Sequence, residues 1–449
     1  MKILLVNPYI YDFTAYDLWL RPMGLLYISS VIRKYTDCEI YWMDLLDRFA
    51  YDKKPKSKKD GRGKYNKEIV EKPEIYEKIP RNYSRYGIDS ELFKKKLNDL
   101  PDMDIILFTT LMTYWIDGLN YTVTEIKKRF PDAFYILGGI IPTLIGENFA
   151  GYMEFNKIIY GYGEEKILKH LKMLGCKIKD HPDLSILENI PYPDFDILGT
   201  KKYLPLMTSR GCPFRCSYCA SHLLNKKFLQ RDADDIYAEI EYMVDKFDTK
   251  HFIIFDDAFL INKEKRFFKV FSKVKKNFNI GFHTPNGLHT AEIDKKTASI
   301  LFDSGFRTIR LSFESTSGEL LKKSSNKVSV KDMISAVEEL TRAGFKKSDI
   351  ECYLLFGLPG QDLGEMESSI NFVKYLGIKP RLSFFSPVPG TIEFQRIKKL
   401  GIIDSELNLY QTNKLYFLYE KSGFSINEIT HIKNLVQKVS ESQEKKMSS

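Results

Sequence analysis

One stretch decides the fold expected for this chain: Ser209-Arg210-Gly211-Cys212-Pro213-Phe214-Arg215-Cys216-Ser217-Tyr218-Cys219-Ala220. It holds three of the six cysteines of the chain. Thiolates spaced this closely on a loop with glycine and proline can surround one compact metal centre, and iron-sulfur clusters are held at such spacings. Three protein thiolates leave one iron of a cubane open, and an open position is typical of a reactive metal site. The loop therefore predicts a catalytic iron-sulfur centre.

Two other interpretations of these cysteines remain open. His222 follows Cys219 by three residues and would complete a Cys3His zinc site, although structural zinc sites usually join two ligand pairs across a longer loop. A disulfide would leave one of the three cysteines unpaired. Both interpretations are weaker than the cluster.

The C-x3-C-x2-C spacing, with an aromatic residue before the last cysteine, resembles the signature of radical S-adenosylmethionine enzymes. The resemblance implies a 4Fe-4S cluster bound by Cys212, Cys216 and Cys219. In the family, the amino and carboxylate groups of S-adenosylmethionine chelate the open iron. One electron from the cluster then cleaves the sulfonium to a 5'-deoxyadenosyl radical. Tyr218 takes the position that usually lies near the adenine, and Phe214 is assigned to the same S-adenosylmethionine site.

Length and composition predict a globular enzyme. The 449 residues allow two or three domains, each with a core, and 43% hydrophobic with 28% charged residues is ordinary. No apolar run approaches the roughly 20 residues that span a bilayer, so no membrane partner is expected. The N-terminal residues 1–8 lack the features of a signal peptide and predict a buried strand. Few cysteines and a cluster loop indicate a reducing cytoplasm.

Short apolar segments alternate with helical patterns in the first third of the chain. This alternation predicts a parallel, doubly wound sheet, which is a Rossmann-like (flavodoxin-like) α/β domain. Ligands of such sheets bind beyond the carboxyl ends of the strands, near the point where the strand order reverses. The predicted strands are residues 3–6, 39–43, 105–109, 134–137 and 158–160, and the candidate ligand loops that follow them are 7–9, 110–115, 138–143 and 161–165.

A Rossmann-like domain with Gly138-Gly139 after its fourth strand and Gly161-Tyr162-Gly163-Glu164 after its fifth, ahead of a radical loop, resembles cobalamin-binding radical S-adenosylmethionine enzymes. The Asp-x-His-x-x-Gly motif that supplies histidine to cobalt elsewhere is absent, as is common among radical members. A side chain of the second loop would then meet the lower face of the corrin, unless these side chains are core aromatics. The candidates for that face are Met112, Tyr114 and Trp115. The resemblance assigns to the cobalamin site Asn7, Pro8, Thr110, Met112, Thr113, Tyr114, Trp115, Gly138, Gly139, Pro142, Thr143, Gly161, Gly163 and Glu164.

The alternation resumes after the cysteine loop and predicts a partial (β/α)6 barrel of parallel strands. Active sites of such barrels sit at the carboxyl ends of the strands, where polar residues collect in this chain. The predicted strands are residues 251–255, 281–283, 308–313, 350–356 and 382–385. Polar or glycine-containing segments follow them at 256–257, 285–289, 314–315, 357–360 and 386–391.

The resemblance distributes S-adenosylmethionine contacts over these strand ends. Asp256 and Asp257 stand where the family usually has Gly-Gly-Glu and would meet the methionyl amino group. Glu314 would approach the methionyl and ribose portions, or would form a structural ion pair with Arg310 or Arg307. The complete set assigned to this cofactor is Phe214, Tyr218, Asp256, Asp257, Ser312, Glu314, Gly357 and Val388.

The expected domain organisation has four parts. A cobalamin-binding domain covers residues 1–165, a linker covers 166–200, the barrel covers 201–400, and a helical C-terminal region with a disordered polar tail covers 401–449. The first domain carries an insertion at residues 53–96 with 15 Lys and Arg against 7 Asp and Glu. Such a patch could bind nucleic acid or an acidic ligand. The simpler expectation is a solvated insertion whose ordered part, residues 80–87, packs across the domain junction.

The function these features predict is a cobalamin-dependent radical S-adenosylmethionine enzyme, first of all a C-methyltransferase. In that mechanism the deoxyadenosyl radical abstracts hydrogen from an unactivated carbon, and the substrate radical collects a methyl group from methylcobalamin. The alternatives are a radical cyclase or rearrangement enzyme, a transfer RNA methylthiotransferase, and a non-enzymatic cobalamin or iron-sulfur sensor. A methylthiotransferase needs a second set of cysteines, and only Cys38 and Cys176 precede the loop.

The partners that this hypothesis implies are few. We expect a small-molecule or peptide substrate and an electron donor such as flavodoxin or ferredoxin. Nucleic acid is not an expected partner, and the chain is expected to be a monomer.

Overall fold

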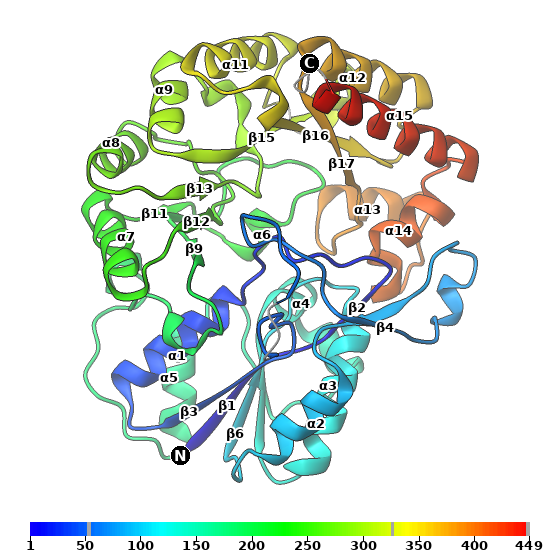
Figure 1. Cartoon of the computed structure of the whole chain (residues 1–449). Helices are drawn as coiled ribbons and strands as arrows, with labels where there is room; N and C mark the ends of the chain where they lie inside the picture. Colours follow the sequence, from blue (N-terminus) through cyan, green and yellow to red (C-terminus); the bar gives the residue numbers. More distant parts are fainter. Residues whose placement is uncertain (52–54, 325–326, 446–449) are drawn as a thin grey trace. The chain divides into compact units, whose positions relative to one another are not determined.

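The computed structural model describes residues 1–51, 55–324 and 327–445. The chain forms two compact units, Met1–Lys201 and Lys202–Ser449, coloured blue to green and green to red in Figure 1. Residues 166–200 lie in the first unit, and the helices after residue 401 lie in the second.

The first unit is built around a five-stranded parallel sheet in the order β3-β1-β6-β7-β8. Residues 3–6 of β1 are all buried, as expected for a parallel strand that is covered on both faces. The register places Val6 beside Met43 and Phe108, so that β1, β3 and β6 end at the same edge. The strands are β1 (Lys2–Asn7), β3 (Glu39–Asp44), β6 (Ile105–Phe108), β7 (Phe134–Leu137) and β8 (Lys157–Ile158). β8 is shorter than expected, and Gly161, at a φ of 68°, turns the chain soon after it.

Helices cover both faces of this sheet. α1 packs against α5 on one face, and α2 packs against α3 on the other (Figure 1). The strand order reverses between β1 and β6, because the chain goes from β1 to β3 on one side and then returns to β6 on the other. A doubly wound sheet places its ligand at this reversal. The helices are α1 (Met23–Tyr35), α2 (Ser90–Asn98), α3 (Ile116–Arg129), α4 (Ile140–Ile145) and α5 (Glu164–Met173).

Asp44, the last residue of β3, makes the stability of the first unit depend on pH. Burial raises the pKa of its carboxyl to about 6, while its Oδ1 accepts hydrogen bonds from Asn7 Nδ2 at 2.7 Å and from the Leu46 amide at 2.9 Å. The folded pKa exceeds the unfolded value of about 4, so protonation favours the folded state. The contribution of Asp44 to the free energy of unfolding is fully present below about pH 4 and is lost as the pH rises through about 6.

We therefore expect Asp44→Asn, which retains the Oδ1 acceptor, to raise the Tm more at about pH 7.5 than at about pH 4.5. Thermal unfolding of the variant and the parent at both pH values measures this. An equal change in Tm at the two pH values would contradict the expectation.

The basic insertion folds as a further layer of the first unit. Its strands β4 (Lys67–Ile69) and β5 (Ser84–Tyr86) join β2 (Ile10–Asp12) in an antiparallel sheet in the order β2-β5-β4. Phe13 packs its ring against Tyr76 and Tyr83, with ring centroids 5.1 Å and 5.3 Å away. Tyr83 belongs to the segment 80–87 that was expected to be ordered, and Tyr76 extends the aromatic packing beyond that segment. Most lysines of the insertion are exposed.

The second unit contains six parallel strands in the order β17-β16-β15-β13-β12-β9, and the short β14 pairs with β15 beyond β13. Five of these strands coincide with the sequence prediction. β9 was not predicted, because Pro205 interrupts its apolar pattern, and proline is tolerated in this strand because it lies at the edge of the sheet. The strands are β9 (Tyr203–Leu206), β12 (His251–Ile254), β13 (Gly281–His283), β14 (Leu288–His289), β15 (Phe306–Glu314), β16 (Ile350–Phe356) and β17 (Lys379–Phe384).

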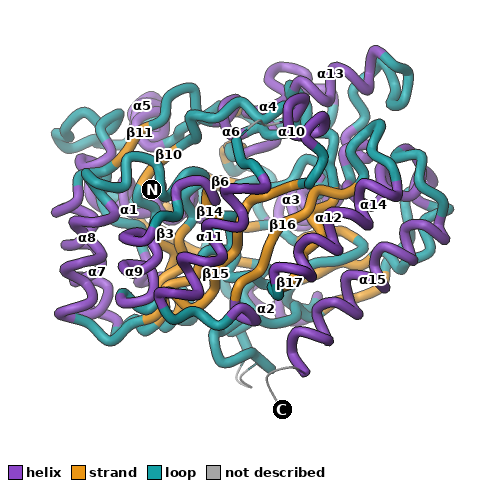
Figure 2. Tube along the Cα trace, turned by 90° about the horizontal axis from the view of Figure 1, so that it is seen from above, coloured by secondary structure: helices purple, strands orange, loops and turns teal. Residues whose placement is uncertain are grey.

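Helices connect these strands and lie along their outer side, as Figure 2 shows in purple beside the orange strands. Phenylalanines fill the space between α8 and the sheet: the rings of Phe271, Phe282 and Phe306 lie 5.0 to 5.2 Å apart. The connecting helices are α7 (Ala233–Phe247), α8 (Phe267–Asn277), α9 (Lys295–Asp303), α11 (Val330–Ala343) and α12 (Leu363–Leu376). This arrangement is the partial barrel that the sequence predicted.

The C-terminal helix α15 (Ile426–Lys445) packs against β17 and α12 of the second unit. Ile429 and Ile432 are fully buried there. The expected disordered tail is wrong for residues 440–445, which continue the helix because Gln443 is buried and bonds to the carbonyl of Lys374. Residues 446–449 lie outside the described part of the chain.

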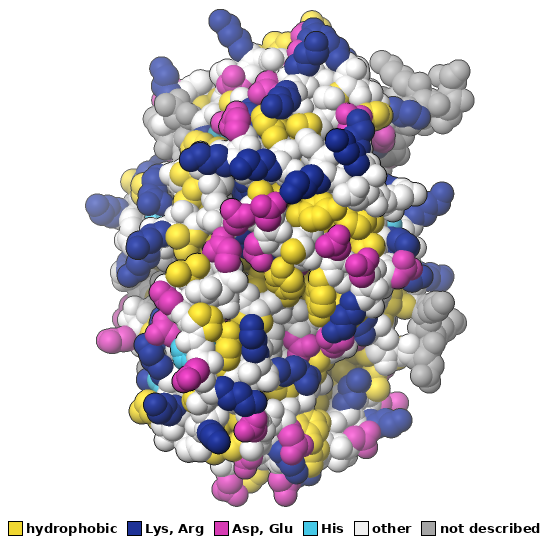
Figure 3. Space-filling model, turned by 90° about the vertical axis from the view of Figure 1, so that its left-hand side faces the viewer, with side chains coloured by type: hydrophobic (Ala, Val, Ile, Leu, Met, Phe, Trp, Pro, Cys, Tyr) yellow, Lys and Arg dark blue, Asp and Glu magenta, His cyan; other side chains and the backbone are white. Residues whose placement is uncertain are grey.

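Charged side chains of both signs are spread over the face of the molecule drawn in Figure 3. Among the residues that the structure describes, none of the helices is long and apolar enough to cross a bilayer.

Candidate active site and cofactor-binding residues

The cysteine loop follows β9, the edge strand of the barrel. A short hairpin, β10 (Ser209–Arg210) with β11 (Leu229–Gln230), fixes the start of the loop. Gly211 then turns the chain at a φ of 83°, and a Cβ there would lie 2.8 Å from the carbonyl oxygen of Lys227. A residue with a side chain would therefore displace the loop.

The three cysteines of the loop are free thiols in one electrostatic environment. Cys216 is buried, and Cys212 and Cys219 are partly buried. Burial raises the pKa of all three thiols, and each thiol acts on the pKa of another. The ammonium group of Lys327 opposes this shift at each of them and so favours the thiolate form. Sequence reasoning did not identify Lys327, which lies more than 100 residues after the loop.

The separation of the candidate donor side chains bears on the kind of metal site that they can form. In the described ranges, no three side chains among His, Cys, Asp and Glu converge closely enough to hold one ion. The Cys3His zinc site with His222 is therefore not assembled. A 4Fe-4S cluster does not need that convergence, because each thiolate binds a different iron.

Glu314 connects the end of β15 to the cysteine loop. Its carboxylate accepts a hydrogen bond from the hydroxyl of Tyr218 and pairs with Lys327 Nζ at 3.0 Å. Burial raises the pKa of Tyr218 well above its usual value, so the hydroxyl stays protonated and donates. Arg310, one of the two arginines expected as an alternative partner, instead pairs with Glu351 at 2.9 Å.

The backbone of Glu314 is strained. Its φ is 79°, in a region that residues with a side chain rarely adopt, and the pairing register with β16 shifts beside it. Strain of this kind is typical of functional sites, where the surrounding structure holds a side chain in a required place.

The two neighbouring aspartates after β12 have different environments. Asp256 is 3% exposed and accepts hydrogen bonds from the Thr208 amide and the Ser209 hydroxyl at 2.7 and 2.6 Å. Arg266 pairs with it at 3.2 Å. Asp257 is reached by water and accepts a bond from the hydroxyl of Ser221, although the surrounding protein raises the pKa of its carboxyl. Asp257 therefore has the freer carboxylate for a ligand, while Asp256 joins β9 to β12.

The other residues assigned to S-adenosylmethionine lie at strand ends of the same barrel. Ser312 on β15 lies against Gly287, where a Cβ would meet its hydroxyl at 2.2 Å. Gly357 follows β16 at a φ of 89° and donates its amide to Gln361 Oε1 at 3.0 Å. Val388, partly buried, follows β17. The carboxyl ends of these parallel strands form one edge of the sheet, and Ser312, Gly357 and Val388 lie at or just beyond it.

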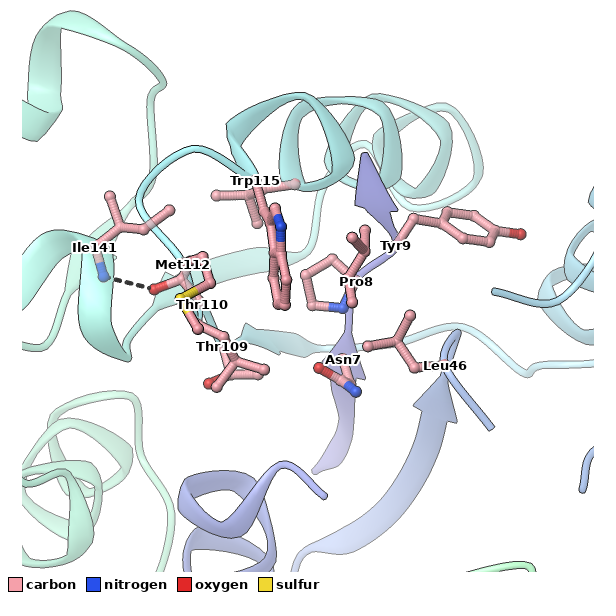
Figure 4. A pocket seen from close by; sticks show the side chains of 12 residues that line it. Asn7, Pro8, Tyr9, Leu46, Thr109, Thr110, Met112, Trp115 and Ile141 are labelled. Carbon is pink, nitrogen blue, oxygen red and sulfur yellow. Dashed lines mark hydrogen bonds between the residues drawn. The ribbon is translucent and has the colours of Figure 1, made fainter. Parts of the chain in front are cut away.

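The first unit has its own pocket at the carboxyl ends of β1 and β6, where the strand order reverses (Figure 4). Five of the residues predicted for the cobalamin site line it: Asn7, Pro8, Thr110, Met112 and Trp115. Three further lining residues, Tyr9, Leu111 and Ile141, lie in the predicted ligand loops but were not assigned to cobalamin. The lining residues outside those loops are Ile10, Leu46, Thr109 and Leu119, which are mostly apolar and therefore look like core in the sequence.

The second loop gives its three candidate side chains different positions. Met112 is 45% exposed, and Tyr114 is buried, with a pKa raised well above the usual value by burial. Trp115 is partly buried, and its indole nitrogen donates a hydrogen bond to Asp12 Oδ2 at 3.2 Å. Figure 4 shows the indole ring directed into the pocket, opposite Asn7 and Pro8. Trp115 is therefore the large side chain of this loop best placed against a ligand.

The glycine loops lie beside this pocket. Gly139 adopts a φ of 97°, and a Cβ there would lie 2.5 Å from backbone atoms of Thr110, so only glycine fits. Thr143 Oγ1 accepts a hydrogen bond from the Gly161 amide at 2.9 Å and so connects the loop after β7 to the loop after β8. The remaining predicted residues are Thr113 and Pro142, which are buried; Gly138 and Gly163, which are partly buried; and Glu164, which is buried in the first turn of α5.

Comparison with known proteins agrees with these features. Residues 206–373 match the model of the radical SAM superfamily. An uncharacterized methyltransferase of Pyrococcus horikoshii is 25% identical over 321 residues, which cover 65% of this chain and 68% of the relative. Bacteriochlorophyllide d C-12(1)-methyltransferase of Chlorobaculum tepidum is 24% identical over 286 residues, 59% of each chain.

Solved structures extend the likeness over most of the chain. The radical S-adenosylmethionine methyltransferase TsrM from Kitasatospora setae, solved with cobalamin and a [4Fe-4S] cluster, matches with a TM-score of 0.65 and 14% identity, covering 89% of this chain and 75% of its own. The cobalamin-dependent S-adenosylmethionine radical enzyme OxsB matches with a TM-score of 0.57 and 16% identity, covering 89% of this chain and 55% of its own.

The chain carries a radical S-adenosylmethionine domain at residues 206–373. Its α/β fold is that of the superfamily members that carry a cobalamin-binding domain. The family and the fold expected from the cysteine loop and the alternating strands are both confirmed.

Proposed function

We propose that this protein is a cobalamin-dependent radical S-adenosylmethionine enzyme that methylates an unactivated carbon. The observation that carries the proposal is the combination, in one chain, of a three-thiol loop at the edge of a barrel and a small pocket at the strand reversal of a Rossmann-like sheet, lined by five of the residues predicted for cobalamin. The names of the relatives support it, because two of those compared are methyltransferases. A small-molecule substrate is supported by TsrM, which has also been solved with tryptophan.

The residues of the second unit would hold the radical chemistry. When bound, the cluster and S-adenosylmethionine supply an electron and a 5'-deoxyadenosyl radical. Cys212, Cys216 and Cys219 would hold the irons, with Lys327 offsetting their negative charge. Glu314, kept in place by Tyr218 and Lys327, and Asp257 would orient the polar groups of S-adenosylmethionine.

The residues of the first unit would hold cobalamin, which supplies the methyl group when bound. Thr110 and the glycines at 138 and 139 would let the backbone approach the corrin, because no side chain intervenes there. Trp115 would lie against the lower face of cobalt. No histidine lines the pocket, so binding without a histidine ligand is expected.

One relative favours a second candidate, a radical cyclase. The anaerobic magnesium-protoporphyrin IX monomethyl ester cyclase of Cereibacter sphaeroides is 27% identical over 213 residues, 40% of this chain. The methylthiotransferase alternative has less support, although such enzymes are among the relatives. Its second cluster needs cysteines in the first unit, and Cys38 and Cys176, 3.4 Å apart, are two rather than three.

The test of the proposal is made with the full chain, reconstituted anaerobically with iron, sulfide and cobalamin. A candidate substrate such as tryptophan or a chlorophyllide is supplied with S-adenosylmethionine labelled in its methyl group. A labelled methylated product, with both S-adenosylhomocysteine and 5'-deoxyadenosine formed, supports methylation. 5'-Deoxyadenosine with an unlabelled, cyclised product would support the cyclase instead. Failure to cleave S-adenosylmethionine would favour a sensor.

The proposed chemistry also implies an electron donor, a cellular compartment and an oligomeric state. Reduction of the cluster needs an electron donor such as flavodoxin or ferredoxin, and both cluster and thiols need a reducing cytoplasm. A monomer suffices, because the cluster thiols and the residues proposed around S-adenosylmethionine all come from one chain.

The role of Trp115 gives a specific prediction. A large apolar group against the lower face of cobalt keeps water from coordinating there, as hydrophobic surroundings control solvent access to metals generally. We expect Trp115→Ala to retain folding and the iron-sulfur cluster but to let water coordinate cobalt and to slow methyl transfer. Absorption and electron paramagnetic resonance spectra of bound cobalamin measure the change.

Two controls accompany the Trp115 variant. His170→Ala, on α5, should leave the cobalt spectra unchanged. If Trp115 were only a core residue, its removal would cost about 3–5 kcal/mol of stability and would lower cobalamin and cluster content alike. Unchanged cobalt spectra in a stable Trp115→Ala protein would exclude the residue from the site.

A further inference from the structure

His289 is a polar side chain beside the cysteine loop that has no hydrogen-bond partner. It lies on β14 next to Ser312 of β15, and both its ring nitrogens are buried without a partner among the described residues. A buried donor or acceptor left in this state typically costs about 1–3 kcal/mol. Because the ring is otherwise held in place, we expect the missing hydrogen-bond partner of His289 to be a group that is not part of the chain.

The position of the ring indicates where that partner lies. The imidazole stacks on Phe214, with ring centroids 4.5 Å apart and planes inclined by 20°. Phe214 lies midway between Cys212 and Cys216 in the cysteine loop. Lys327 and Glu314, which surround the thiols, also act on the pKa of His289. The imidazole therefore packs on the cysteine loop, within electrostatic range of the two charged groups that also act on the Cys216 thiol.

The charge state of the ring decides what it can donate. Burial is the main cause that lowers the pKa of His289, and the positive charge of Lys327 adds to it. The carboxylates of Glu292, Asp332 and Glu314, on the elements around the ring, act in the opposite direction. A neutral imidazole at pH 7 has one N–H donor and one acceptor nitrogen. The acceptor of this N–H is not the carboxylate of Glu314, which binds Tyr218 and Lys327 instead.

We propose that His289 is a positioning residue that donates a hydrogen bond from its ring N–H to a sulfur atom of the iron-sulfur cluster and thereby makes the cluster easier to reduce. The inference rests on the proposed function only in needing the cluster. It involves neither cobalamin nor substrate. Hydrogen bonds to cluster sulfurs are among the main determinants of reduction potential, because they stabilise the more negative, reduced state.

The test compares two variants of the reconstituted full chain. His289→Phe retains a ring to stack on Phe214 and lacks both nitrogens, whereas His289→Gln retains an N–H donor. Redox titration followed by electron paramagnetic resonance, without S-adenosylmethionine, measures the potential at equal iron content. At a fixed applied potential, we expect the ratio of reduced to oxidised cluster in His289→Phe to be about tenfold lower than in the parent, which is a shift of about −59 mV in the reduction potential. We expect the reduction potential of His289→Gln to stay near that of the parent.

The same titration distinguishes a cluster sulfur from the S-adenosylmethionine carboxylate as the acceptor of the His289 hydrogen bond. Equal potentials in the parent and His289→Phe would overturn the proposal. If the potentials were equal and only S-adenosylmethionine binding were weakened in His289→Phe, the acceptor would be the S-adenosylmethionine carboxylate and the cluster proposal would fail. Loss of methylation with normal cluster potentials would bear on the proposed function alone.

A second measurement keeps the proposal testable if His289→Phe does not retain the cluster. In parent protein with 15N-labelled histidine, pulsed electron paramagnetic resonance of the reduced cluster should show a weak nitrogen coupling that is absent in His289→Gln. No such coupling in the parent would overturn the proposal.

Discussion

Replacing Cys216 by Ala is expected to remove the iron-sulfur cluster and, with it, all reductive cleavage of S-adenosylmethionine. Cys216 is the middle and the most deeply buried of the three cysteines, so its loss leaves two thiolates for a cluster that needs three. Iron and sulfide analysis, together with assay of 5'-deoxyadenosine, measures both losses after anaerobic reconstitution.

The matched control for this substitution is Cys38→Ala in the first unit. Cys38 contacts Cys176 at 3.4 Å and has no part in the cysteine loop, so that variant should retain the full iron content and cleavage activity. Stoichiometric zinc without iron in the anaerobically purified parent would contradict the cluster assignment. Retention of four irons by Cys216→Ala would contradict the ligand assignment.

The second large effect is expected on stability. Asp256→Ala should lower the free energy of unfolding by about 3–5 kcal/mol, because it leaves the guanidinium of Arg266 buried without its carboxylate. It also removes the acceptor of the Thr208 amide and the Ser209 hydroxyl, which fix the chain just before the cysteine loop. Denaturant unfolding of the protein without cofactors measures the change independently of cluster binding.

The neighbouring aspartate provides the control. Asp257→Asn should leave the free energy of unfolding nearly unchanged, since its carboxyl is reached by water and accepts a hydrogen bond from the Ser221 hydroxyl that an amide oxygen can also accept. The same variant should weaken binding of S-adenosylmethionine to the reconstituted protein. Equal losses of stability in the two variants would contradict the separate roles given to the two residues.

The sequence predicted most of the parallel strands because each of those contains a short run of mainly apolar residues. β1 and β16 were found in this way, and the strand ends then located the ligand loops. β9 was missed because Pro205 breaks its pattern, although proline is acceptable at the edge of a sheet. The helical end of α15 was missed because its residues are polar, and the contact of Gln443 with Lys374 comes only from tertiary packing.

The candidate site was predictable only where residue type and spacing carry the chemistry. The three cysteines meet that condition. The sequence could not distinguish Asp256 from Asp257, because the difference comes from Arg266, ten residues further along the chain. Lys327 and His289 are single residues without a motif. Their relation to the cysteines appears only when β14, β15 and the loop come together in the fold.

The left-handed backbone of Glu314 has a consequence for how this sequence can evolve. At a φ of 79°, glycine would relieve the strain, and asparagine would reduce it, whereas glutamate retains a cost of about 1 kcal/mol. Selection for stability alone would therefore replace Glu314. Its presence indicates that selection retains the carboxylate. Substitutions of Glu314 that stabilise the protein should therefore lower its activity.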